Sequence, residues 1–191
     1  MFYEMERSSK KKEELISIIV ELMDEEGLKN VTIKDICKAT NISIGAFYHY
    51  FQSKDSIVDE MFILMDEFFL VNQEAILQHP TTAEQIIDFV NHFGIYVEKW
   101  GYYANLLIMR SHITKYSHNK KRRLYGILEE IILKGINDRE FKVKIETEEL
   151  IVMIFVIMRG YLLEWVNREH DYPVRDNMVK QVTYLLKSLT I

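Results

Sequence analysis

The sequence contains few of the residues that interrupt helices. Seven glycines and two prolines stand among 191 residues, less than half of the roughly 12% that these two types contribute to an average protein. A collagen-like chain is therefore excluded, and turn-rich β folds and glycine-loop nucleotide folds are disfavoured. Hydrophobic residues make up 48% of the chain and charged residues 28%. This composition allows a sizeable core, and the scarcity of helix breakers favours long helices around it.

Cysteine and long hydrophobic runs are also scarce. Cys37 is the single cysteine, which excludes a disulfide framework and a zinc site of four thiolates and fits a reducing compartment. The longest uninterrupted apolar run, residues 150–158, is nine residues long, far short of the ~20 that span a bilayer. The first residues carry acids at Glu4 and Glu6 and no apolar segment, unlike a secretory signal. We expect a soluble cytoplasmic protein without a membrane partner.

Positive charge is in deficit as well. The chain has 24 Lys and Arg residues against 29 Asp and Glu, a net charge of −5. Residues 1–60 alone hold 8 basic and 12 acidic side chains, so no generally basic domain is available to a nucleic acid. Any contact with DNA must come from cations and polar groups that are placed locally.

Apolar residues recur at helical spacing along nearly the whole chain, and no alternation typical of strands appears. The pattern predicts an all-α fold of about nine helices, in which a long helix from Ser53 to about Leu77 joins an N-terminal three-helix segment to a C-terminal bundle. Residues with cap chemistry indicate where helices begin. These are Thr32 with Asp35, Ser43, Ser53, Thr81 with Glu84, Thr147 and, for the last helix, Pro173.

Three further stretches carry expectations of their own. Residues 150–158 are apolar on all sides, so their helix should lie at the centre of a bundle or in an interface. The cationic run at residues 120–123 is expected to be a solvated helix start. The run at residues 10–12 leaves two interpretations open, contact with DNA phosphates or simple solvation.

Two short helices, residues 32–40 and 44–50, joined by a turn have the layout of a helix-turn-helix. In the second helix Phe47 and Phe51 are four residues apart and share the inner side. A helix that enters the major groove needs such a packed side and short or polar groups outside. Taken residue by residue, an ordinary amphipathic helix with an aromatic core face is the simpler explanation. The residues that project away from the core side are Gly45, Ala46, Tyr48 and His49.

The residues in and around these helices resemble the DNA-binding segment of the tetracycline-repressor (TetR) family. Residues 31–36 and 43–55 read VTIKDI and SIGAFYHYFQSKD. They couple a T-[IV]-x-x-I helix, a G-x-[FL]-Y-x-[YH]-F recognition helix and an S-K-[DE] helix start at the family's spacing. The resemblance covers about residues 10–60, and further along residues 135–141, GINDREF, look like a common turn of the family.

The resemblance implies a homodimeric transcriptional regulator whose last two helices form the dimer interface. Residues 1–53 would be the DNA-binding domain, and residues 54–191 a helical domain that binds a small molecule and dimerises. Ile44 and Ala46 depart from the more polar residues that family members often carry, which leaves the operator sequence open. The residues expected to face DNA are Thr32, Lys34, Ser43, Ile44, Gly45, Ala46, Tyr48, His49 and Lys54.

Bulky aromatic and methionine side chains are concentrated between residues 61 and 165. They suit an adaptable apolar pocket, although a plain hydrophobic core explains each of them singly. Together with the resemblance they indicate a largely apolar or aromatic effector, which Asn105, Arg110, His112 and Glu164 would orient. The candidate lining residues are Met61, Met65, Phe68, Phe93, Tyr96, Trp100, Tyr103, Met109, Phe155, Met158 and Trp165.

The resemblance therefore predicts a ligand-responsive regulator, by default a repressor, that binds a palindromic DNA operator and is released by a small molecule. A helical interaction module without sequence-specific DNA binding stays open as the alternative, because the bulk charge is acidic. An enzyme is disfavoured: the six histidines lack metal-ligand spacing, and no G-x-S-x-G, P-loop or G-x-G-x-x-G motif occurs. We expect no catalytic residues, no cofactor and no metal.

Overall fold

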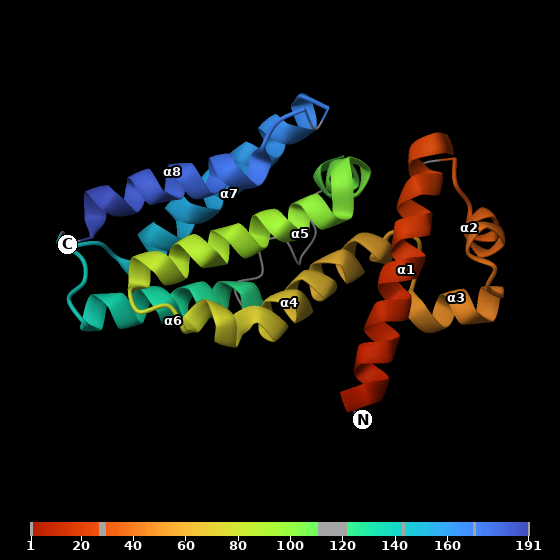
Figure 1. Cartoon of the computed structure of the whole chain (residues 1–191). Coiled ribbons are helices and arrows are strands. Elements are labelled where there is room, and N and C mark those ends of the chain that lie inside the picture. Colours follow the sequence, from red (N-terminus) through yellow and green to blue (C-terminus); the bar gives the residue numbers. More distant parts are fainter. Residues whose placement is uncertain (1, 27–29, 111–121, 143, 170, 191) are drawn as a thin grey trace. The chain divides into compact units, whose positions relative to one another are not determined.

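Eight α-helices make up the computed structural model (Figure 1), which describes residues 2–26, 30–110, 122–142, 144–169 and 171–190, with side chains from residue 10 onward except that of Arg110. In this part of the chain no strand forms, and an isolated antiparallel bridge joins Phe141 to Thr190. The predicted all-α fold is confirmed. The helices are α1 (Phe2–Glu26), α2 (Ile33–Thr40), α3 (Ile44–Tyr50), α4 (Ser56–Leu77), α5 (Thr82–Arg110), α6 (Arg123–Asn137), α7 (Thr147–Asn167) and α8 (Val174–Leu189).

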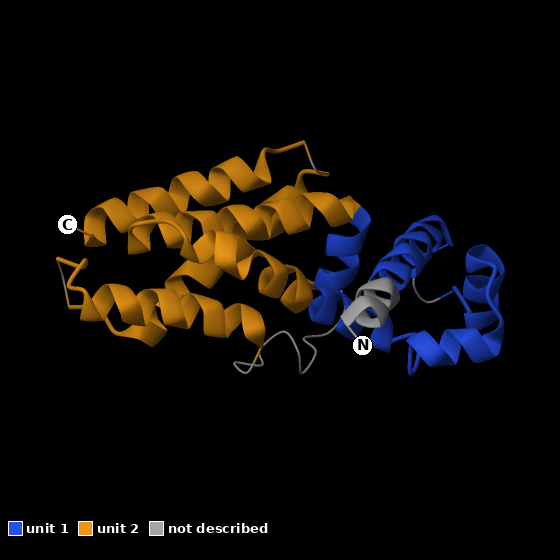
Figure 2. Ribbon diagram, turned by 60° about the horizontal axis from the view of Figure 1, so that its bottom comes forward, with its two compact units in different colours: residues 1–64, 103–118 blue, residues 65–102, 119–191 orange. Residues whose placement is uncertain are grey.

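The helices divide between two compact units (Figure 2). Unit 1 comprises residues 1–64 and 103–118, and unit 2 comprises residues 65–102 and 119–191. Within unit 1, α1 packs on α2 and α2 on α3; within unit 2, α6 packs on α7 and α7 on α8. The helices α4 and α5 each continue from one unit into the other. Among the described residues, no helix combines the length and the apolar character needed to cross a membrane.

Two helices begin with the reciprocal capping that their sequences predict. At α2, Thr32 Oγ1 accepts a hydrogen bond from the Asp35 N–H at 3.3 Å, and the Asp35 carboxylate accepts one from the Thr32 N–H at 2.9 Å. Thr81 and Glu84 repeat this arrangement ahead of α5. The hydrogen bonds from Thr32 stabilise the charged carboxylate and hold the pKa of Asp35 below its ordinary value.

Two other helix boundaries differ from the sequence prediction. Ser53 Oγ accepts from the Ser56 N–H at 3.1 Å as a cap should, but the regular helix α4 begins only at Ser56. The predicted Thr147 cap is wrong. Thr147 is the first helical residue of α7, and the extended backbone that a cap requires belongs to Glu146, whose side chain makes no capping hydrogen bond.

The helix α5 has a kink at Gly101, where φ is +72° and ψ is −177°. This left-handed backbone interrupts the helical geometry and favours glycine, which has no Cβ. The kink separates the regular stretch before residue 101 from a shorter one after it, which accounts for the ninth helical segment of the prediction.

Arg122 is buried, so the expectation of a solvated helix start at residues 120–123 is wrong for this residue. Its Nε and Nη2 donate to the Asp66 carboxylate at 3.0 and 3.1 Å, and the Leu124 N–H donates to the same carboxylate at 3.2 Å. Asp66 of α4 thus caps α6 from a different helix, a partner that local sequence cannot reveal. Lys120 and Lys121 lie outside the described residues.

The turn after α6 connects the ends of several helices in unit 2. A Cβ on Gly135 would lie 2.6 Å from Thr82 Cγ2, so the absence of a side chain lets α6 approach the start of α5. The Glu140 carboxylate accepts from the Thr82 N–H and hydroxyl at 2.8 and 2.9 Å. Residues 135–141 therefore have a structural role, because they fix the start of α5 against the end of α6.

The apolar stretch of α7 is buried on one side only. Leu150, Ile154 and Met158 are fully buried, whereas Val152 and Val156 are 49% and 62% exposed. One side of this stretch therefore belongs to the core of unit 2, and the other side is apolar and accessible in the single chain.

Candidate nucleic-acid interface and effector site

The helix α3 has a buried inner side and an exposed outer side. Phe47 and Phe51 are buried in unit 1 with ring centroids 5.3 Å apart. Ser43 Oγ accepts a hydrogen bond from the Ala46 N–H at 3.1 Å and caps the helix as predicted. The two phenylalanines fix the rotation of α3 about its axis and thereby decide which residues face outward.

The outer side carries the residues of α3 that the sequence predicts to meet DNA. At 100° per residue, Gly45 and His49 project most directly away from the phenylalanines, and both are exposed. Tyr48 flanks them and is 55% exposed, whereas Ile44, three residues before Phe47, lies nearer the phenylalanine side at the start of the helix and is 48% exposed. Ala46 lies on the opposite flank and is half-buried. This surface is small, partly apolar and free of negative charge.

Nothing in the fold requires glycine at residue 45. Its φ is not positive, and the nearest heavy atom to an added Cβ would be Ser43 Oγ at 3.8 Å, an ordinary contact distance. Glycine within a helix costs about 0.5–1 kcal/mol relative to alanine. Its benefit at this position is a backbone that can be approached closely from outside.

Several of the other predicted DNA contacts make hydrogen bonds within unit 1. Thr32 Oγ1 donates to the Asp35 carboxylate at 2.5 Å, in addition to its capping role. Lys54 Nζ donates to the Val31 carbonyl oxygen at 2.9 Å, which ties the start of α4 to the approach to α2. Lys34 is exposed on α2. These bonds hold the helices of the helix-turn-helix in place.

The cationic run at residues 10–12 is largely paired with acids of unit 1. Lys12 Nζ lies 2.6 Å from the Glu60 carboxylate in a partly buried ion pair, and Lys11 lies 3.1 Å from Glu14. Lys10 is exposed. At least two of the three charges therefore take part in contacts within the unit.

The candidate effector residues are divided between the units. Met61, Tyr103 and Met109 belong to unit 1, where Met61 is fully buried and the other two are exposed. The remaining eight belong to unit 2, where Phe68 and Trp100 are half-buried. The buried ones there are Met65, Phe93, Tyr96, Phe155, Met158 and Trp165.

Three of the candidates form an aromatic row in unit 2, which we define as Phe68, Tyr96 and Trp100 together with His92. Ring centroids are 5.4 Å apart between Phe68 and Tyr96, and 6.1 Å apart between Tyr96 and Trp100. His92 lies 6.0 Å from Phe68. Trp100 Nε1 is buried without a hydrogen-bond partner. A buried donor left unsatisfied is unfavourable, and an acceptor on a ligand would satisfy it.

Phe155 and Trp165 make ring contacts of their own. Phe155 stacks on Tyr125 with centroids 4.3 Å apart, and Trp165 lies 6.5 Å from Tyr102. His92 and Tyr125 are absent from the predicted set. The four-residue spacing from His92 to Tyr96 was a usable signal, whereas Tyr125 meets Phe155 only because α6 packs on α7.

The polar residues proposed to orient the effector have varied surroundings. Glu164 Oε1 accepts from Arg168 Nε at 2.6 Å on the surface of unit 2. Asn105 is buried in unit 1. His112 and the side chain of Arg110 lie outside the described part of the chain.

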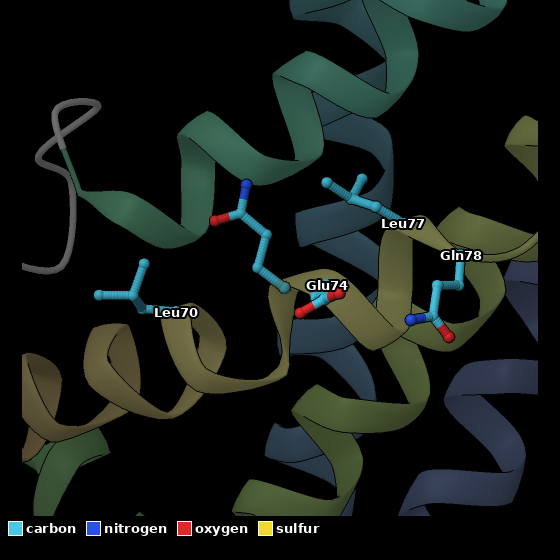
Figure 3. A pocket seen from close by; sticks show the side chains of 5 residues that line it. Leu70, Glu74, Leu77 and Gln78 are labelled. Atoms are coloured by element: carbon cyan, nitrogen blue, oxygen red, sulfur yellow. The ribbon is translucent and has the colours of Figure 1, made fainter.

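An open groove of about 450 Å³ follows one face of α4 in unit 2 (Figure 3). Its lining residues follow an i, i+3, i+4, i+7, i+8 pattern, which places them on one side of a helix. None of the predicted effector residues lines it. The lining residues are Leu70, Gln73, Glu74, Leu77 and Gln78.

Residues 15–61 match the family model of bacterial regulatory proteins of the tetR family. These residues contain α2 and α3 with parts of α1 and α4. Over 53 residues the chain is 43% identical to the HTH-type transcriptional repressor KstR2 of Rhodococcus jostii (strain RHA1). That stretch covers 28% of this chain and 26% of that repressor, so this likeness spans only about a quarter of either protein.

Weaker similarity extends over most of the chain. It is 23% identical over 180 residues to the fatty acid metabolism regulator protein of Bacillus subtilis (strain 168), covering 89% of this chain and 91% of that protein. The crystal structure of the transcriptional regulator FadR from Bacillus subtilis in complex with stearoyl-CoA has a TM-score of 0.76 at 22% identity, covering 90% of this chain and 95% of that one. The two chains share the fold.

Proposed function

We propose that this chain, whose residues 15–61 match the family model of bacterial regulatory proteins of the tetR family, is a TetR-family repressor that binds a palindromic DNA operator as a homodimer and leaves it when an apolar ligand binds. The family is a class of transcriptional regulators. One observation carries the proposal: the exposed outer side of α3 lies within residues 15–61, which match the family model. We assign DNA binding to residues 1–53, and effector binding and dimerisation to residues 54–191.

The DNA contacts follow from the chemistry of the outer side of α3. In a helix-turn-helix the second helix enters the major groove with its N-terminal residues against the base edges. Tyr48 and His49 can donate hydrogen bonds to phosphates or bases, and Lys34 can contact the backbone. Because the net charge is −5, general attraction to DNA is weak, and affinity depends on the fit of this surface.

Dimerisation is proposed through α7 and α8. Val152, Val156 and Leu163 are exposed on α7, and Tyr184 is 53% exposed on α8. The three α7 residues and Gly160 share one side of the helix. A Cβ on Gly160 would have no atom within 4 Å in the single chain, so a second copy can approach this side closely. An exposed apolar stripe of this kind favours a protein interface.

The aromatic row is proposed as part of the effector site. Aromatic rings suit an apolar ligand body, and the unsatisfied Trp100 Nε1–H suits one acceptor on that ligand, such as a carbonyl oxygen. The relative FadR is crystallised with stearoyl-CoA. An acyl thioester, which has a long apolar chain and a carbonyl oxygen, is therefore the first effector class to test.

Release from DNA is proposed to work by a change in spacing between the two recognition helices. A dimer must present them about 34–36 Å apart to reach successive major grooves. A ligand shifts the protein away from that spacing only by its differential affinity for the two conformations. The helix α4 connects the two functions in the chain, because it begins in unit 1 and ends in unit 2.

Selection of bound duplexes from a random DNA pool tests the DNA-binding function. We expect enrichment of a palindrome whose half-sites are one helical turn apart. The double variant Tyr48→Ala/His49→Ala, which changes two exposed side chains, should bind this palindrome at least about tenfold more weakly while keeping its melting temperature. Failure to enrich any sequence would favour the interaction module without sequence-specific DNA binding.

The effector class is tested separately with stearoyl-CoA and with coenzyme A alone. Stearoyl-CoA should raise the melting temperature and lower operator affinity, and coenzyme A should do neither. Trp100→Phe keeps the ring and removes only the N–H donor, so it should weaken acyl-CoA binding about two- to tenfold, as expected for one lost hydrogen bond. An equal response to both compounds would contradict the acyl thioester assignment.

A further inference from the structure

We propose that α3 reads its operator mainly through the C5-methyl groups of thymines, with Ile44 as the side chain that makes the decisive contact. The inference rests on the proposed DNA-binding function and adds to it the chemistry of recognition. The expected partner is a half-site with a thymine at the position that faces the first turn of α3.

The first argument is the composition of the recognition helix. Specific hydrogen bonding in the major groove relies on Arg or Lys for guanine, Asn or Gln for adenine, and Asp or Glu for cytosine. The sequence of α3, IGAFYHY, contains none of these six residue types. No arginine occurs between Arg7 and Arg110, so residues 31–55 offer no guanidinium to a guanine.

The second argument is that nearby polar groups are held by the fold. Ser43 Oγ accepts the Ala46 N–H, and the Thr32 hydroxyl bonds to Asp35 in the capping box. Lys54 Nζ donates to the Val31 carbonyl oxygen. On α3 itself, Tyr48 and His49 are the side chains with polar groups that are exposed.

The third argument is the exposure of Ile44. It is the first residue of α3 and is 48% exposed in the chain. A single exposed aliphatic side chain is common on protein surfaces, but in the first turn of α3 it is available to a partner that approaches this helix. The thymine methyl is the apolar group that a base edge presents in the major groove, and the N-terminal residues of a recognition helix are those closest to the bases.

Gly45 makes this contact possible at short range. An isoleucine side chain is shorter than the arginine or glutamine that usually reaches base edges, so the helix backbone must come closer to the DNA. Gly45 projects directly outward and carries no side chain, although the fold would accept one. The pair of Ile44 and Gly45 therefore fits a close, apolar approach to the bases.

The test is a double-mutant cycle between the protein and the operator. Each thymine of the selected half-site is replaced in turn by uracil, which lacks only the methyl group. For the unmodified protein we expect one position at which uracil weakens binding about fourfold, as expected for one buried methyl group. Ile44→Ala should weaken binding to the thymine operator about tenfold. In this variant the same uracil substitution should change affinity by less than about 1.5-fold.

Val71→Ala is the matched control, because Val71 is an 81% exposed aliphatic residue on α4 in unit 2. It should leave both the affinity and the uracil penalty unchanged. The inference is overturned if the selected half-site lacks thymine, if uracil is neutral at every position, or if the uracil penalty persists in Ile44→Ala. Absence of any selected operator would instead overturn the proposed DNA-binding function.

Discussion

Gly45 is a residue that the fold does not require to be glycine and that we propose to matter for DNA binding. Among the helical glycines of this chain, Gly135 is explained by a tight contact and Gly101 by its backbone conformation. At Gly45 the structure shows neither, since its nearest contact for an added Cβ is 3.8 Å away and its φ is not positive. The sequence predicts this residue as a point of close approach to DNA, and this stays a prediction.

Gly45→Ala should stabilise the protein and weaken operator binding. Alanine should add up to about 1 kcal/mol to the free energy of unfolding, because it restricts the unfolded chain and suits a helix. Operator affinity should fall about tenfold, because one extra methyl group in a tight contact costs about 1–3 kcal/mol. Chemical denaturation and a DNA titration measure the two effects. Unchanged affinity would show that the DNA does not approach this residue.

The aromatic row shows the limit of residue-scale prediction. Phe68, Tyr96 and Trp100 were identifiable as bulky residues at helical spacing, and they do contact one another. The unsatisfied Trp100 Nε1 could not be predicted, because whether a donor has a partner depends on all the helices around it. The assignment of these residues to an effector site stays a prediction.

At the scale of the helix, local capping is where sequence and structure agree best. The capping boxes of α2 and α5 form between residues three apart, so the relevant groups are neighbours whatever the rest of the chain does. The prediction that Thr147 caps α7 is wrong because local sequence does not decide between two adjacent candidates for the cap. Thr and Glu are adjacent there, and the choice between them as the cap depends on how the preceding loop enters the helix.

The free energy of unfolding of Asp35→Asn should depend less on pH in the acid range than that of the wild type. Hydrogen bonds from Thr32 lower the pKa of Asp35 in the folded state, so the ionised form contributes stability that is present above the ordinary value of about 3.9 and is lost as pH falls through the lower folded pKa. The variant should be less stable at pH 7 and should lose less stability below about pH 4. Denaturant titrations over this range measure it, with Asp24→Asn, an exposed carboxylate of α1, as the control. Parallel profiles for the wild type and Asp35→Asn would contradict the prediction.

Gly135→Ala and Gly126→Ala, both in α6, should have opposite effects on stability. The first places a Cβ 2.6 Å from Thr82 Cγ2 and should cost about 1–3 kcal/mol of unfolding free energy. The second places a Cβ where no atom lies within 4 Å and should add about 0.4–1 kcal/mol. Thermal or denaturant unfolding measures both. A neutral Gly135→Ala would mean that the end of α6 moves easily from α5.

At the scale of the whole molecule, the exposed apolar side of α7 bears on how the chain assembles. The apolar run of α7 suggests a buried helix, yet Val152 and Val156 are accessible. A helix that is apolar all round belongs in a core or an interface, and here one side is buried in the core of unit 2 while the other is exposed. The dimer that we propose would cover the exposed side.

Gly160→Leu should abolish the dimer without harming the chain. The Cβ that the substitution introduces would meet no atom within 4 Å in the single chain, and leucine has a higher helix propensity than glycine. In a closely packed dimer the same side chain would force the copies apart. We expect a folded monomer by sedimentation velocity and circular dichroism, with weakened operator binding. Gly126→Leu, at another open glycine, is the control, and a persistent Gly160→Leu dimer would locate the interface elsewhere.

Interactions between residues that are near one another in the sequence can be predicted from the sequence alone. The helical class, most helix boundaries and the composition of the α3 surface were predictable, because they depend on contacts within a turn or two. The signals were the spacing of apolar side chains, the scarcity of glycine and proline, and caps formed between residues three apart. Other features depend on residues that are far apart in the chain. Arg122 is buried against Asp66, and Gly135 packs on Thr82. One side of α7 is exposed because no other helix of the single chain covers it. Such outcomes depend on how whole helices pack, since the same side chain is stable in solvent or in a core according to the neighbours that packing supplies.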